Sequence, residues 1–130
     1  MNASMPPDQF TGSVEPTPHD SHAQSAARAG RLRADADKLE AFCVVVRAAS
    51  AAADHAAFVE VSRAASQALH AKFGGGSITS VFTWLTGREG SAALESVLAG
   101  EVALAGPLSI QQVVEAVELA KKAELLRQKR

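Results

Sequence analysis

The chain has 130 residues, the size of one domain rather than two. Its 13 basic and 14 acidic residues nearly cancel, which argues against a protein built mainly to neutralise phosphates, because such proteins carry a basic excess. The single cysteine, Cys43, excludes an intrachain disulfide framework and favours a reduced, intracellular protein. No run approaches the ~18 to 20 apolar residues of a membrane span, and no secretory signal is recognisable.

Alanine dominates the apolar fraction of the chain. The sequence is 47% hydrophobic and contains 27 alanines, but only five phenylalanines, one tryptophan and eleven leucines. Alanine is the best helix former and a poor core filler, because it buries a single methyl group. We therefore expect closely approaching helices around a thin core.

Residues 1–22 differ in composition from the rest of the chain. They hold four of the five prolines, with serine, threonine, aspartate and glutamine between them. Such a segment cannot bury enough apolar surface to offset the entropy lost on ordering, and proline also removes amide donors. The sequence therefore predicts a disordered arm over 1–22 and a helical domain over 23–130.

A long helix is predicted from about residue 22 to residue 52. Apolar residues recur there at intervals of seven, three and four, which places them on one helix face and close to a heptad seam. Asp35 interrupts that seam and weakens the coiled-coil interpretation. The members of this face are Leu32, Leu39, Phe42, Val46, Ala49 and Ala53.

The second helix is predicted to follow Asp54, whose carboxylate can accept hydrogen bonds from the exposed amides of the first turn. Three glycines at 74–76 are expected to end it. We interpret this glycine run as a hinge rather than a phosphate-binding loop, because the lysine of that motif is missing. The apolar face comprises Phe58, Val61, Ala65, Leu69 and Phe73.

Two short helices are predicted next. Ser77 can cap the first of them, and although its residues also favour strands, strict alternation is absent. Gly87 and Gly90 are expected to end this helix. Ser91 is expected to start another that stops at Gly100. The apolar stripe of the first is formed by Ile78, Val81, Phe82 and Leu85.

The last helix has the clearest predicted start, while residues 101–106 stay unassigned. Ser109 and Gln112 have the spacing of a capping box, in which each side chain satisfies the other residue's amide. Glu118 and Lys122 are placed to form an ion pair four residues apart. Its apolar face is expected to contain Ile110, Val113, Val114, Val117 and Ala120. Together these segments predict an all-α protein, a small bundle of four to five helices with a disordered N-terminal arm.

Residue types that could carry chemistry are scattered along the chain. His19, His22, His55 and His70 form no metal-binding spacing, and we interpret them as surface residues. Cys43 lies beside Phe42 on an apolar face, which favours a buried small hydrophobe over a reactive thiol. No nucleophile motif or paired carboxylates are present. The sequence therefore predicts no catalytic, cofactor-binding or metal-binding residue, and no enzyme.

Two segments are candidates for contact with a partner. Phe82, Trp84 and Leu85 form the one dense aromatic cluster, interpreted either as core or as a docking anchor, since tryptophan is enriched in interface hot spots. A basic C-terminal run can be a solvated helix end, or can touch nucleic acid or anionic lipid. That run contains Lys121, Lys122, Arg127, Lys129 and Arg130.

We expect a non-enzymatic protein–protein interaction protein, acting as a structural, adaptor or chaperone-like component that binds a partner or itself. A first alternative is a bacterial component or substrate of a type III-like secretion apparatus. The arm has no Lys or Arg before Arg28 and is similar to the mobile leaders of type III secretion substrates. A second alternative is a nucleic-acid-associated regulator using the basic tail. The expected location is cytoplasmic, or secreted without a signal peptide.

Overall fold

The computed structural model describes residues 18–74 and 77–129, with side chains described from residue 23 onward. Within these ranges the chain is all-α and contains no strand, as the sequence predicts. Predictions for residues 1–17 lie outside the described residues. The helices are α2 (Pro18–Ser50), α3 (His55–Phe73), α4 (Ile78–Thr86), α5 (Arg88–Leu98) and α6 (Ile110–Gln128).

The chain divides into two units, residues 1–31 and 32–130. The described part of the first unit is the beginning of α2, where residues 23–31 are all exposed. The helix begins at Pro18 rather than at residue 22, because a proline fits the first turn, where its missing N–H is not needed. The buried core belongs to the second unit.

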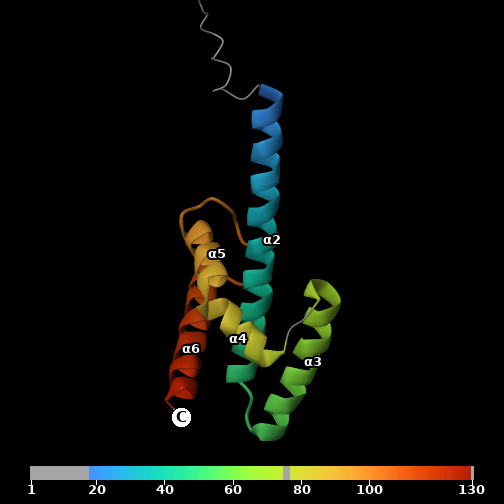
Figure 1. The fold of residues 1–130 in the computed structure, drawn as a ribbon. Coiled ribbons are helices and arrows are strands. Elements are labelled where there is room, and N and C mark those ends of the chain that lie inside the picture. Colours follow the sequence, from blue (N-terminus) through green and yellow to red (C-terminus); the bar gives the residue numbers. More distant parts are fainter. Residues whose placement is uncertain (1–17, 75–76, 130) are drawn as a thin grey trace, which may run out of the picture. The chain divides into compact units, whose positions relative to one another are not determined.

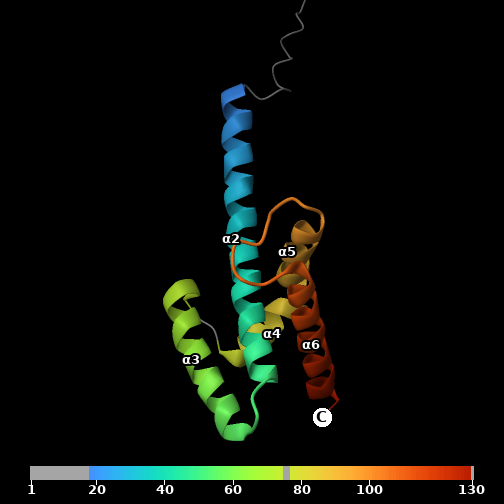
Figure 2. The same ribbon diagram turned by 180° about the vertical axis from the view of Figure 1, so that it is seen from behind.

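Helix α2 is the central element of the second unit. Its C-terminal half lies between α3 on one side and α5 and α6 on the other, and α4 crosses it (Figures 1 and 2). The predicted face is confirmed at Leu39, Phe42, Val46 and Ala49, whereas Leu32 is half-buried. The buried arc is wider than that face because α2 has neighbours on more than one side. It also includes Ala36, Glu40, Cys43 and Val45, whereas Ala53 lies beyond the helix and is exposed.

Helices α3, α4 and α6 begin with the capping residues that the sequence predicts. The side-chain oxygens of Asp54, Ser77 and Ser109 each accept a hydrogen bond from the backbone N–H three residues later, at 2.8, 3.1 and 3.1 Å. At α6 the Gln112 side chain accepts from the Ser109 N–H, which completes the capping box. Gly74 ends α3 with φ at 80°, a left-handed conformation that favours glycine.

The prediction that Gly90 ends a helix is wrong. Helix α5 begins at Arg88, three residues before the predicted start at Ser91. Gly90 therefore lies inside this helix, where it is buried. A Cβ atom at Gly90 would lie 2.4 Å from the carbonyl oxygen of Trp84 and 2.8 Å from the Cα of Leu85. The absence of a side chain therefore lets the first turn of α5 pack directly on the last turns of α4.

The loop between α5 and α6 is held against α2 by hydrogen bonds to the buried carboxylate of Glu40. Glu40 is 5% exposed, and its two carboxylate oxygens accept the backbone N–H groups of Gly106 and Leu108, each at 2.8 Å. A charged acceptor makes these bonds stronger than those between neutral groups. Residues 101–106, unassigned from sequence, are thus part of a loop held against the central helix.

Replacing Gly90 with alanine should destabilise the protein by about 1–3 kcal/mol, because the new methyl group overlaps backbone atoms that cannot move aside. Urea unfolding of the variant and the wild type measures the effect. The matched control is Gly30→Ala, since a Cβ there meets nothing within 4 Å and alanine is the better helix former. Equal stability of the Gly90 variant and the wild type would contradict the packing described.

Replacing Glu40 with alanine should lower the free energy of unfolding by about 1–3 kcal/mol, because it removes the acceptor of two part-buried amides. Hydrogen exchange should show the amides of Gly106 and Leu108 losing protection, ahead of the amides inside α6. Asp37→Asn serves as the control, since Asp37 makes a surface ion pair with Arg33 and should change stability little. Unchanged exchange at both loop amides would show that Glu40 does not hold the loop.

Candidate functional site

An aromatic cluster joins α2, α3 and α4. Phe42 packs edge-on against Trp84 and Phe73, with ring centroids 5.2 and 5.9 Å apart. The ammonium of Lys38 lies 4.9 Å from the centroid of the Trp84 ring, within cation–π range. The indole nitrogen of Trp84 is buried and has no hydrogen-bond partner in the part of the chain that the structure describes. Trp84 therefore makes extensive contacts within this chain, and its role at an interface stays a prediction.

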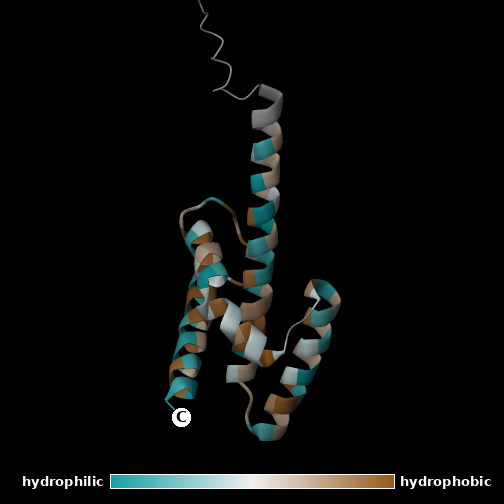
Figure 3. Cartoon of the chain, viewed as in Figure 1, coloured by the Kyte–Doolittle hydropathy of each residue, from teal (hydrophilic) through white to brown (hydrophobic). Residues whose placement is uncertain are grey.

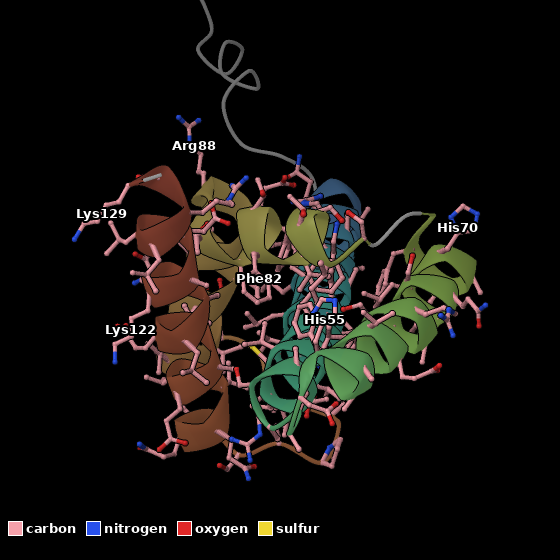
Figure 4. The ribbon with its side chains drawn as sticks, turned by 90° about the horizontal axis from the view of Figure 1, so that it is seen from below. His55, His70, Phe82, Arg88, Lys122 and Lys129 are labelled. Carbon is pink, nitrogen blue, oxygen red and sulfur yellow. The ribbon has the colours of Figure 1, made fainter. Side chains whose placement is uncertain are left out.

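The other residues of the predicted aromatic anchor lie in two different environments. Leu85 is fully buried, so in this conformation it packs in the core and is not accessible to a partner. Phe82 is half-buried, on the side of α4 that faces α3 and α6 (Figure 4). There it lines an apolar groove of about 310 Å³ together with Phe58, Ile78, Ala123 and the pair of Glu124 and Arg127. The fold thus brings Phe82 and Arg127, predicted from separate segments, to one groove.

Part of the basic run on α6 is paired with acidic residues of the same helix. Lys121 lies 3.7 Å from Glu118, and Arg127 lies 2.6 Å from Glu124. The predicted ion pair of Glu118 with Lys122 is wrong. Glu118 instead contacts Lys121, which follows it by three residues rather than four. The hydrogen bond from Arg127 to Glu124 raises the pKa of that guanidinium above its already high ordinary value, so it stays charged.

The remaining cations of this run extend into solvent. Lys122 and Lys129 are exposed and point away from the other helices (Figure 4). Arg130 lies outside the described residues. The candidate basic residues are therefore spread along the surface of α6 and do not converge on one point.

Helix α6 directs its small apolar residues inward and its leucines outward. The residues it buries are Val113, Ala116, Val117 and Ala120. Ile110, Leu119, Leu125 and Leu126 are instead 47, 39, 58 and 64% exposed. Among the residues with described side chains they make up four of the seven large hydrophobics that are exposed, and the other three lie on three separate helices. Figure 3 shows hydrophobic segments alternating with hydrophilic ones along α6.

We define the outward face of α6 by three lines of residues, each with a seven-residue spacing that keeps its members nearly in register along a helix. A shallow hollow of about 510 Å³ lies on this face, and all of its lining residues, such as Val114 and Leu119, belong to α6. The three lines are Leu119 with Leu126, Glu115 with Lys122 and Lys129, and Gln111 with Glu118 and Leu125.

Sequence reasoning missed the outward leucines of α6. The predicted apolar face followed the spacing of Val113, Val117 and Ala120, and it also included Ile110, which the structure leaves largely exposed. The signal that could have found the second stripe is the seven-residue repeat of Leu119 and Leu126. A helix with leucines on the side opposite its buried face has apolar surface in two directions.

The thiol of Cys43 is buried, as predicted, and is poorly placed to react. Its sulfur donates a hydrogen bond to the Val113 carbonyl at 3.8 Å. Burial raises the pKa of the Cys43 thiol from its ordinary 9.0 to about 12, with the charge of Glu40 adding to the rise and that of Arg47 opposing it. Because the thiolate is the nucleophile, this thiol has little reactivity near neutral pH.

The histidines do not gather into a site. His55 and His70 are exposed near opposite ends of α3 (Figure 4), and the side chains of His19 and His22 lie outside the described ones. Over the described residues, no group of three or more His, Cys, Asp or Glu side chains is arranged to hold a metal ion. None of the described helices combines the length and hydropathy that a membrane span requires.

Comparisons with known proteins add no relative to this description. No protein-family model matches the chain, and no curated protein or solved structure matches it. The residues of the outward face of α6 are therefore interpreted from their own chemistry.

The raised pKa of Cys43 predicts both slow labelling and a pH effect on stability. Iodoacetamide at pH 8 should label the thiol of the native protein far more slowly than that of the urea-unfolded chain. Folding favours the protonated thiol, so its contribution is fully present below pH 9 and is lost as pH rises from 9 towards 12. Unfolding curves of Cys43→Ala should lack this alkaline loss, and rapid labelling of the folded protein would contradict the burial of the thiol.

Proposed function

We propose that this chain is a non-enzymatic protein–protein interaction protein that binds through the outward face of α6. One observation carries the proposal, namely that α6 buries alanines and valines while it exposes leucines. Burying a leucine side chain contributes about 1.5–3 kcal/mol, so exposed leucines give up a stabilisation that a bound partner would restore. A cluster of exposed apolar residues bordered by polar ones is typical of interaction sites.

The outward face of α6 suits a protein partner better than a nucleic acid. Its leucines flank a line of charged residues, so a partner has to offer apolar surface and complementary charges side by side, which the surface of a protein supplies. Two cations of the basic run, Lys121 and Arg127, already contact carboxylates of their own helix. Glu115 and Glu118 on the same face would repel a phosphate backbone. These charges weigh against the nucleic-acid alternative.

The environments of Cys43 and of the histidines on α3 support the proposal of a role without catalysis. The pKa of Cys43 is raised by burial, and the exposed histidines of α3 stand apart from one another. A nucleophile needs a neighbouring base and an orienting group within hydrogen-bond distance. The described histidines have no such partner among the contacts that organise the fold.

The double variant Leu119→Glu/Leu126→Glu should abolish binding, because two carboxylates would replace the apolar contacts of a whole line of the face. Tagged wild-type and variant chains are used to purify bound proteins from the native cells, followed by mass spectrometry that also scores untagged copies of this chain. The matched control is Val59→Glu, an exposed apolar residue on α3. Circular dichroism checks that each variant keeps its helices. If the wild type and the double variant retain the same proteins, α6 is not the binding surface.

A further inference from the structure

The charges on the outward face of α6 are segregated along the helix. The acidic residues of this face, Glu115 and Glu118, lie in the N-terminal half of α6. The basic residue Lys122 lies in its C-terminal half, and Lys129 is its C-terminal cap. A helix with this pattern is complementary to its own reverse. A second α6 running antiparallel places each acidic half opposite a basic half, whereas a parallel copy places like charges together.

We propose that the partner of this face is a second copy of the same chain, bound as an antiparallel α6–α6 pair around a two-fold axis; this inference rests on the proposed function. Such an interface is isologous, so each favourable contact occurs twice. The axis lies near residue 120, the register in which Glu118 of one copy faces Lys122 of the other. The same register places Gln111 opposite Lys129.

The apolar residues fit the same arrangement. Leu119 lies close to the axis and so meets Leu119 of the second copy, while Leu125 packs beside the aliphatic part of Glu115. The hollow between Val114, Leu119 and Lys122 lies on this surface and gives room for a side chain of the second copy. The charged pairs along the centre of this surface set the orientation of the two helices, and the leucines beside them provide apolar burial.

The existing ion pairs of the acidic residues do not prevent this arrangement. Glu118 lies 3.7 Å from Lys121, and Glu115 lies 3.8 Å from Arg47, and all four side chains are more than a third exposed. Exposed pairs at such distances are weak and readily exchanged. Lys122 and Lys129, in contrast, have no ion pair among the described residues, and they point outward where a second copy would lie (Figure 4).

Charge reversal tests the pairing directly. The variant Glu115→Lys/Glu118→Lys makes the face entirely basic, and Lys122→Glu/Lys129→Glu makes it entirely acidic. Sedimentation equilibrium should find a dimer for the wild type, monomers for each variant alone, and a heterodimer when the two variants are mixed. The matched control, Glu60→Lys/Glu95→Lys, makes the same charge change on exposed sites of α3 and α5 and should remain dimeric.

Disulfide formation tests the orientation. In the antiparallel register Leu119→Cys lies next to its own copy and should cross-link on mild oxidation. Leu126→Cys should not, because its copy lies ~18 Å away along the helix axis, beyond the reach of a disulfide. Cross-linking at both positions would indicate a parallel pair and overturn the inference. The native Cys43 is buried and does not interfere.

The two proposals fail in different ways. A wild type that stays monomeric at millimolar concentration, with no cross-link at position 119, overturns self-association. If a different protein then co-purifies with the wild type but not with the Leu119→Glu/Leu126→Glu variant, the binding role of α6 stands and its partner is another chain. If neither dimer nor any α6-dependent partner is found, both proposals fall.

Discussion

The fold of the second unit depends on the burial of one acidic side chain on its central helix. Glu40 lies among apolar residues of α2, where its carboxylate is removed from water. The N–H groups of Gly106 and Leu108 donate the hydrogen bonds that water would otherwise supply. Both residues lie within three positions of Ser109, the cap of α6. The bonds therefore fix where α6 starts relative to α2, and with it which residues of α6 face inward and which face solvent.

Small residues make the close packing around this helix feasible and also explain the exposed leucines. Gly90 brings α5 onto α4, and Ala116 and Ala120 are fully buried on α6. A helix that approaches its neighbours through alanines leaves no room for leucines on the same side. The larger apolar side chains of α6 are consequently displaced to its outward face, where they form the proposed binding surface. The thin core and the exposed apolar face thus have one structural origin.

The aromatic residues show how far local sequence can mislead about a site. Phe82, Trp84 and Leu85 are neighbours in sequence, yet Phe82 lines a groove, Trp84 packs edge-to-face with Phe42 beside the ammonium of Lys38, and Leu85 is fully buried. Successive residues on a helix point about 100° apart, so a cluster in sequence separates onto different faces. By contrast, residues seven apart on α6, such as Leu119 and Leu126, stay together although they are distant in sequence.

Most helix boundaries could be predicted from local sequence, because a helix depends on interactions between residues three or four apart. The caps at Asp54, Ser77 and Ser109 and the left-handed end at Gly74 are all local, and each is found where the pattern predicts it. The role of Gly90, the burial of Glu40 and the outward direction of Leu126 became evident only from the packing of the helices. Those outcomes depend on contacts between residues far apart in the chain, such as Glu40 with Leu108, which no local spacing encodes.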